Sequence, residues 1–242
     1  MANRPRGQGT HTIRCISEDA LLVEFGDTLD DRIHEQVRAM DTALRHSAIA
    51  DQLETLPTFR SLLVKFDPFT LSPRVLVDFV EALDLTQSRS EPRTWRVPVC
   101  LEGEYAEDLP EVARLLECTE PSIREGLLGS SLKLYMYGFA PGFAYLGGLD
   151  SSLAIPRRNT PRKPMPRGSL MIAGGLASLA SVSMPTGWYV VGRTPVRMFS
   201  LECDDLVPFS VGDSLRFYAV TPEEYAALEA QGDRAGLEGG CR

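Results

Sequence analysis

The sequence changes character at Leu132, and this change limits the folds that the chain can adopt. From Leu132 to Pro222, glycine and proline are frequent, apolar runs are short, and no long 3.6-residue period appears. Short strands separated by turns are typical of all-β domains. We therefore expect a closed or nearly closed β-barrel with functional loops, followed by a helix over residues 222–231.

The first 93 residues alternate strands with helices instead. Two strand pairs are predicted, and each is followed by an amphipathic helix that begins at an N-cap residue, Asp30 or Ser72. The order β-β-α-β-β-α predicts a two-layer sandwich in which two helices cover one sheet. The strand pairs are 12–16 with 20–25 and 52–58 with 61–67, and the apolar helix residues are Ile33, Val37, Met40 and Leu44, and Val75, Leu76, Phe79, Val80 and Leu83.

The predicted fold class is thus α+β, an N-terminal two-layer α/β sandwich followed by a C-terminal β-barrel. A strand over 95–101 and helices over 109–118 and 121–128, the second capped by Thr119, lead into the barrel. The expected segments are a disordered lead-in over 1–11, the N-terminal domain over 12–93, the barrel domain with basic loops over 94–225, and a terminal helix and tail over 226–242.

The charges are distributed unevenly along the chain. The formal net charge is −8, which argues against a binder of nucleic acids or anionic membranes. Residues 151–201 nevertheless hold seven Arg and Lys and no Asp or Glu, so this window carries +7 and the rest of the chain carries −15. We expect the basic window to meet a small anionic substrate or an acidic partner surface.

Cysteine and histidine give little sign of chemistry. The five cysteines are widely spaced without a C-x-x-C pair, which predicts reduced thiols in a cytoplasmic protein rather than a zinc site or a disulfide framework. His34 and His46 lie in a helical pattern and are expected to be exposed. No Walker A loop, G-x-G-x-x-G fingerprint or nucleophile elbow occurs, and no apolar segment is long enough to span a bilayer. We expect this chain to bind no metal or cofactor itself.

The densest motif runs from Gly138 to Asp150. Pro141 and Gly142 are the favoured centre of a type II turn, because proline fixes a negative φ and glycine accepts a positive one. Successive N–H groups in such a turn can bind an anion, and neighbouring aromatic rings can wall an apolar pocket. The alternative is a tight barrel corner with core aromatics. The candidate binding residues are Gly138, Phe139, Pro141, Gly142, Phe143 and Tyr145.

A proline-rich basic segment over 156–168 follows. Its four prolines exclude a helix and favour an extended loop. Arg158 and Arg162 are four residues apart, so an extended chain points both to one side, where guanidinium groups can bind a carboxylate or phosphate. A solvated basic loop is the alternative. Arg157 is a further candidate binding residue.

Two more turn signatures lie within the basic window. Met-Pro-Thr-Gly-Trp supplies Gly187 and Trp188 as candidate binding residues, and Gly-Arg-Thr-Pro supplies Arg193 and Thr194. Arg193 is a second candidate for anion binding. A tryptophan beside a glycine turn is equally explained by simple packing.

Taken together and in order, these motifs resemble the family that contains the B subunit of 5-oxoprolinase, also called allophanate hydrolase subunit 1 or Kip inhibitor-like proteins, which carries the carboxyltransferase domain, subdomains C and D. The joint pattern is specific although each piece alone is not. The matching segments are 138–149, 156–162, 166–170 with 172–175, 185–188 and 191–195, with weaker matches that include Asp108-Leu109.

The resemblance implies a fold and a set of partners. The fold is an N-terminal α+β domain with a C-terminal cyclophilin-like β-barrel. The partner is a C subunit, which is Kip antagonist-like and carries carboxyltransferase subdomains A and B; in 5-oxoprolinase a third subunit joins. The implied function is one subunit of an ATP-dependent amide or lactam hydrolase or carboxyltransferase complex, inactive alone, with ATP or biotin used by the complex rather than bound by this chain. Neither a nucleic acid nor a membrane is implied.

The sequence departs from the family pattern in several segments, and two of these positions bear on the chemistry. Leu127 stands where the family usually has a histidine, and Leu176 stands where it usually has a glutamine. Two groups that could donate hydrogen bonds or protons are therefore missing, and no catalytic residue is assigned.

The resemblance leaves two hypotheses open. In the first, a small amide, urea-like or lactam substrate binds between this barrel and the C subunit. Arg158 and Arg162 then hold a carboxylate or carboxyphosphate-like group, and main-chain N–H groups near Gly142 stabilise an oxyanion. In the second, the chain is a non-catalytic regulator that binds and inhibits a sensor histidine kinase, as some relatives do.

Overall fold

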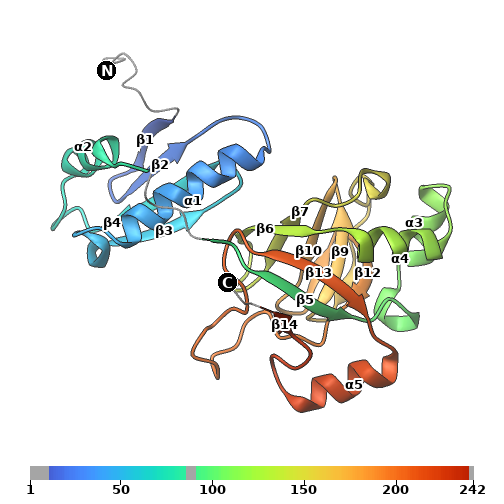
Figure 1. Cartoon of the computed structure of the whole chain (residues 1–242). Helices are drawn as coiled ribbons and strands as arrows, with labels where there is room; N and C mark the ends of the chain where they lie inside the picture. Colours follow the sequence, from blue (N-terminus) through green and yellow to red (C-terminus); the bar gives the residue numbers. More distant parts are fainter. Residues whose placement is uncertain (1–10, 86–90, 240–242) are drawn as a thin grey trace. The chain divides into compact units, whose positions relative to one another are not determined.

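The computed structural model describes residues 11–85 and 91–239. The lead-in expected over 1–11 lies outside the described residues except for His11, as do residues 86–90 and Cys241. The chain divides into two compact units between Glu91 and Pro92, and each unit is considered by itself (Figure 1).

The first unit is the predicted two-layer sandwich. Its four strands form one antiparallel sheet in the order β1-β2-β4-β3. Alternate sheet residues, such as Leu21, Val23, Leu62 and Val64, share one buried core with both helices. The elements are β1 (Thr12–Ser17), β2 (Ala20–Glu24), α1 (Asp31–Arg45), β3 (Leu53–Pro57), β4 (Ser61–Phe66) and α2 (Pro73–Ala82), with a 3₁₀ turn at Ala50–Gln52.

The capping signals in this unit have mixed outcomes. The Asp30 side chain accepts from the N–H groups of Arg32 and Ile33, as an N-cap should. Ser72 occupies the N-cap position of α2 but makes no such bond. Two burial predictions are wrong: Val75 is 57% exposed, and His34 is fully buried. His34 lies three residues before the buried Val37, on the same stripe of α1.

The second unit is built on an eight-stranded sheet in the order β12-β9-β10-β7-β6-β13-β5-β14. Its neighbouring strands are antiparallel except for β13 and β5, which are parallel. The strands are β5 (Thr94–Val99), β6 (Leu132–Tyr137), β7 (Ala144–Gly147), β9 (Ser169–Ala173), β10 (Leu176–Leu179), β12 (Tyr189–Arg193), β13 (Ser214–Ala219) and β14 (Glu238–Gly239).

Of the closed or nearly closed barrel that the sequence predicts, the closed form is wrong. The strands β12 and β14 are the two edges of an open sheet. At one end of the sheet, β14 pairs with β5 at Trp95 and Arg96. The opposite edge strand, β12, contacts this end only at Cys100, the residue that follows β5. There, paired backbone hydrogen bonds of 2.8 and 2.9 Å join Cys100 and Arg193. The sheet is therefore curved enough for its ends to approach at one corner without closing.

Both faces of this sheet are buried near β9, β10 and β12. One face contributes Leu170, Ile172, Leu179 and Val191 to the large core that α3 and α4 also enter. The opposite face contributes Met171, Ala180 and Val190 to a smaller cluster. The helices of this unit are α3 (Leu109–Leu115), α4 (Glu120–Gly129) and α5 (Pro222–Gln231), with 3₁₀ turns η2 (Gly103–Ala106) and η3 (Ser151–Leu153).

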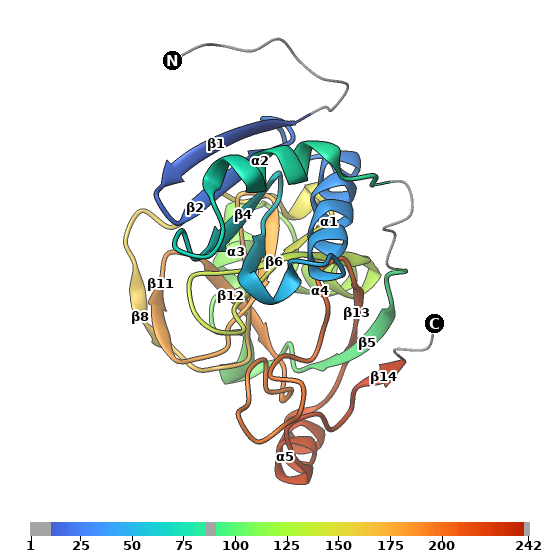
Figure 2. The same ribbon diagram turned by 90° about the vertical axis from the view of Figure 1, so that its left-hand side faces the viewer.

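A separate two-stranded ribbon, β8 (Arg162–Met165) with β11 (Met184–Thr186), covers the smaller cluster and is seen side-on in Figure 2. Met165 and Met184, which lie opposite each other in the ribbon, are both members of that cluster. The ribbon thus packs on the smaller cluster and is not part of the eight-stranded sheet.

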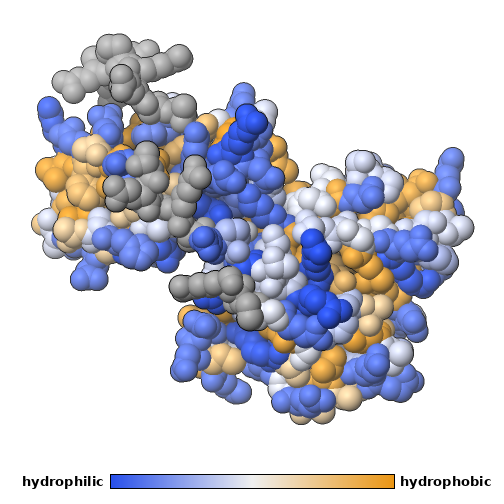
Figure 3. All heavy atoms as spheres, viewed as in Figure 1, coloured by the Kyte–Doolittle hydropathy of each residue, from blue (hydrophilic) through white to orange (hydrophobic). Residues whose placement is uncertain are grey.

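In Figure 3, apolar residues reach the surface as separate patches among hydrophilic ones. Within the described ranges, no helix is both long and apolar enough to cross a membrane.

Candidate functional site

The glycine-rich motif forms the predicted tight turn between β6 and β7. Phe143 N–H donates to Ala140 O at 3.0 Å, and Gly142 has φ +72°, as a type II turn centred on Pro141 and Gly142 requires. A Cβ on Gly142 would lie 2.5 Å from Met198 O. Only glycine fits here, because both the φ angle and the space exclude a side chain.

Phe139 is held at the tip of this turn in an unusual conformation. Its φ is +69°, which is strained for a bulky residue, and its side chain is 79% exposed. Two backbone hydrogen bonds, Gly138 N to Phe143 O and Ala140 N to Gly138 O, brace the turn on either side. Strain retained at an exposed aromatic residue is a mark of functional sites.

Phe139 begins a row of aromatic contacts that brings several predicted site residues together. Its ring lies 5.7 Å from Phe143, which lies 5.0 Å from Tyr145, which lies 6.1 Å from Trp188. The row ends at Arg157, whose guanidinium lies 5.5 Å over the Trp188 ring. Burial raises the pKa of Tyr145, with Arg157 opposing the shift. Tyr145 is therefore a neutral phenol near pH 7.

The aromatic row lies against the smaller cluster under the ribbon. Phe143 and Trp188 are buried members of that cluster, and Tyr145 packs against it half-buried. Three methionines complete it: Met165, Met171 and Met184. Unbranched thioether side chains adapt to different shapes more readily than branched residues.

Arg158 and Arg162 have partners within this chain. As their spacing predicts, both point to one side, and there both reach Asp108, at 3.5 and 2.6 Å. Arg158 also contacts Glu111 at 2.6 Å, and Arg162 pairs with Glu107. Burial disfavours the charge of Arg158, but the hydrogen bond to Glu111 and the attraction of Asp108 outweigh it, and its pKa is raised.

The sequence did not identify Asp108 as a residue that positions the arginines of the basic loop. Asp108 precedes α3 and is buried, and its Oδ2 accepts from Arg162 Nη1 at 2.6 Å and from Val190 N at 2.7 Å. The sequence signal was present in the weak family match at Asp108-Leu109. Nothing in the sequence said that this carboxylate faces the basic loop, which is about fifty residues away.

Much of the basic window is neutralised in this way. Arg167 pairs with Glu229 at 3.0 Å and Arg197 with Asp233 at 3.0 Å. By contrast, Arg157 and Lys163 are exposed and have no carboxylate partner within residues 11–85 and 91–239. Arg157 is therefore the guanidinium of the loop that remains available to an anion.

Arg193 and Thr194 make their contacts with other residues. Arg193 lies 5.0 Å over the Tyr105 ring and donates to Glu104 O at 3.2 Å. Thr194 is buried and receives the Val196 N–H on its hydroxyl. Gly187 is tied to the basic loop through its carbonyl, which accepts from Arg158 N at 2.8 Å.

The two departures from the family pattern lie in apolar surroundings. Leu127 is fully buried in the main core on α4. Leu176, at the start of β10, packs half-buried against the smaller cluster. Neither position offers a proton donor or acceptor.

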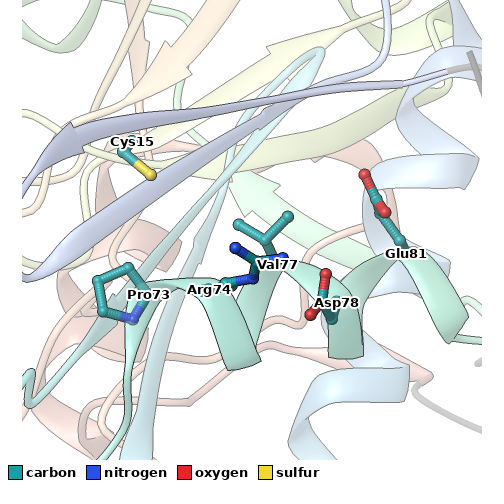
Figure 4. Close-up of a pocket in the computed structure, with 6 residues that line it drawn as sticks. All are labelled: Cys15, Pro73, Arg74, Val77, Asp78 and Glu81. Carbon is teal, nitrogen blue, oxygen red and sulfur yellow. The ribbon is translucent and has the colours of Figure 1, made fainter. Parts of the chain in front are cut away.

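One hollow lies within the first unit. Cys15 on β1 faces a row of α2 side chains across it (Figure 4). Its remaining lining is Pro73, Arg74, Val77, Asp78 and Glu81, residues that lie along α2. None of the predicted site residues lines it.

This chain is similar to a known protein family and to several named proteins. Residues 11–209 match the family described as carboxyltransferase domain, subdomain C and D. The B subunit of 5-oxoprolinase from Haemophilus influenzae is 33% identical over 204 residues, 84% of this chain and 94% of that protein. The B subunit of 5-oxoprolinase from Bacillus subtilis is 27% identical over 234 residues, 91% of this chain and 98% of that protein.

Solved structures match the fold. The crystal structure of TTHA0988 has a TM-score of 0.76 at 25% identity, over 86% of this chain and 40% of that one. The urea carboxylase of Kluyveromyces lactis has a TM-score of 0.72 at 18% identity, over 99% of this chain and 25% of that one. This chain thus spans less than half of either solved chain.

Proposed function

This chain belongs to the family of the carboxyltransferase domain, subdomain C and D, and from that premise we propose that it is a subunit of an ATP-dependent complex that hydrolyses a small amide or lactam. The match covers 98% and 94% of the two 5-oxoprolinase B subunits. The substrate class proposed is a carboxylated lactam of the 5-oxoproline type. Hydrolysis breaks its ring C–N bond, adds water across it, and is coupled to conversion of ATP to ADP and phosphate.

The observation that carries this proposal is the aromatic row that ends at Arg157. A small lactam ring can pack against the accessible part of Tyr145, whose ring makes an edge-to-face contact with Trp188 at 6.1 Å. The Arg157 guanidinium over the same indole is free to bind the substrate carboxylate through two hydrogen bonds. This assigns the anion-binding role to Arg157 rather than to Arg158 and Arg162, whose carboxylate partners are in this chain.

The turn next to the row can hold the substrate carbonyl. The N–H groups of Gly138, Ala140 and Phe143 are used within the turn. Those of Phe139 and Gly142 have no backbone acceptor among the described residues, which leaves them for a developing oxyanion. We assign no general base to this chain. Leu127, at the position where the family usually has a histidine, is buried among apolar residues.

The remaining chemistry is assigned to partner subunits. A C subunit with carboxyltransferase subdomains A and B would complete the site, and ATP would bind to a partner, since this chain has no Walker A loop. The cytoplasmic location and the inactivity of the isolated chain are parts of the same proposal.

The test is reconstitution. The chain is co-expressed with the C subunit and the third subunit from the same genome, and 5-oxoproline-dependent formation of ADP and glutamate is measured. We expect Arg157→Ala to raise KM for 5-oxoproline at least tenfold, as for a lost charged hydrogen bond of about 1.5–3 kcal/mol, while Lys163→Ala leaves KM unchanged. A complex without lactam- or amide-dependent ATP hydrolysis, or an Arg157→Ala complex with unchanged KM, would overturn the proposal.

A non-catalytic role is the second candidate, favoured by the burial of Leu127 at the position of the family histidine. In that case the chain would bind a sensor histidine kinase and inhibit its autophosphorylation. Inhibition of a purified kinase from the same genome, without any complex with the C subunit, would favour this role over the first.

A further inference from the structure

We infer that Ser178 is a specificity-determining residue of the proposed site, whose hydroxyl binds the polar amide group of the substrate. This inference rests on the proposed function for the identity of the ligand. It begins from a hydroxyl that the fold itself leaves unsatisfied: Ser178 is fully buried on β10, and its Oγ has no hydrogen-bond partner in the described structure.

The sheet register fixes the side of β10 on which this hydroxyl lies. The flanking residues Ala177 and Leu179 belong to the main core. Side chains alternate along a strand, so Ser178 points to the opposite face, together with Leu176 and Ala180 of the smaller cluster. The hydroxyl is therefore on the face that carries the aromatic row.

A continuous line of residues crosses four strands on that face. Ser178 lies opposite Tyr145 of β7 on one side and Met171 of β9 on the other. Met171 in turn lies opposite Val190 of β12. Ser178 thus stands directly beside Tyr145, the third of the four rings in the row that ends at Arg157.

An unpaired hydroxyl is costly in such a place, because burying a hydroxyl without a partner costs about 1–3 kcal/mol. Alanine would fill the same position without that cost. Serine is explained if a ligand supplies the partner, and Ser178 can both donate to a carbonyl and accept from an amide N–H. A carboxylated lactam has both of these groups, close to the carboxylate that we assign to Arg157.

Access of a ligand to this hydroxyl requires the neighbouring side chains to move, because Ser178 is fully buried. Its neighbour Met171 and the ribbon residues Met165 and Met184 are unbranched thioethers, which rearrange by side-chain rotation without moving the backbone. Tyr145, which lies opposite Ser178 in the sheet, is half-buried and so keeps part of its surface accessible to solvent.

A matched serine makes the inference testable. Ser169 on the neighbouring strand β9 is equally buried, but its hydroxyl donates to Pro166 O at 2.8 Å. We expect Ser178→Ala to leave the Tm unchanged or raised, and to raise KM for 5-oxoproline about tenfold or more in the reconstituted complex. Ser169→Ala should lower the Tm and leave KM unchanged.

The outcomes separate this inference from the proposed function. If Arg157→Ala raises KM and Ser178→Ala does not, the proposed function stands and the Ser178 inference is overturned, its hydroxyl being satisfied by water instead. If the complex has no lactam-dependent activity, the proposed function has failed. Isothermal titration of the wild-type chain and of Ser178→Ala with 5-oxoproline then decides the inference directly, since equal binding or no binding would overturn it.

Discussion

Asp108 Oδ2 lies 2.6 Å from Arg162 Nη1, and this contact joins the start of α3 to the β8–β11 ribbon that covers the smaller cluster. The same oxygen receives the Val190 N–H of β12 at 2.7 Å. Only 13% of the Arg162 side chain and 11% of the Asp108 side chain remain exposed. Loss of Arg162 therefore leaves a largely desolvated carboxylate with only the longer contact to Arg158, at 3.5 Å.

Removal of Arg162 should be strongly destabilising for that reason. Breaking a buried pair by deleting one partner costs about 3–5 kcal/mol, and we expect a loss of this size for Arg162→Ala. Both tryptophans, Trp95 and Trp188, lie in the second unit, so urea unfolding followed by tryptophan fluorescence reports this unit. Exposed Lys163 is the control, with an expected change of Lys163→Ala within about 0.5 kcal/mol. A loss below about 1 kcal/mol for Arg162→Ala would contradict this assignment.

The same contact explains how far the sequence could predict the site. The four-residue spacing of Arg158 and Arg162 in a proline-rich segment correctly placed both on one side. Their partners Glu107, Asp108 and Glu111 lie about fifty residues earlier, and no local pattern connects the two segments. In the folded chain, most arginines of the window that lacks Asp and Glu are therefore paired with carboxylates from other segments. Arg157 is not paired in this way, and it remains available to an anion.

The fold was predictable where local chemistry decides it. The N-cap at Asp30, the type II turn at Gly142 and the family resemblance carried by the ordered motifs are all confirmed. Closure of the barrel was not predictable, because part of the β5 edge is paired with the two-residue strand β14, which has no sequence signature and lies about 140 residues from β5.

The turn at Gly142 should tolerate no side chain. With φ at +72° and Met198 O 2.5 Å from any Cβ, Gly142→Ala combines backbone strain with a clash against the main chain, and we expect it to cost about 2–4 kcal/mol. Gly174 also has a positive φ, +59°, but nothing lies within 4 Å of its Cβ position. Gly174→Ala should thus cost only about 1–2 kcal/mol. Equal losses for the two variants in urea unfolding would refute the close approach at Gly142.

Phe139 should be replaceable by glycine with a gain in stability. Its side chain is largely exposed and its φ of +69° is strained, so Phe139→Gly relieves a strain of about 1–2 kcal/mol and loses little packing. Glu117, with φ +52°, is the matched control, and Glu117→Gly should gain by a similar amount. A stability loss for Phe139→Gly beside a gain for Glu117→Gly would mean that the Phe139–Phe143 contact outweighs the strain.

Alkaline pH should destabilise the second unit through Tyr225. This phenol is buried against Tyr105, at a ring distance of 4.5 Å, and its hydroxyl donates to Thr194 O at 3.4 Å. Burial raises its pKa from about 10 to about 12. Between these values the unfolded chain has lost the phenol proton while the folded chain retains it, so stability falls as pH rises from about 10 towards 12 and is unaffected by this group below about pH 10. In Tyr225→Phe, the urea concentration at the midpoint of unfolding should fall less steeply with pH over this range. Some fall should remain, because burial also raises the pKa of Tyr145 and Tyr218. An unchanged slope in Tyr225→Phe would show that this phenol titrates alike in the folded and unfolded states.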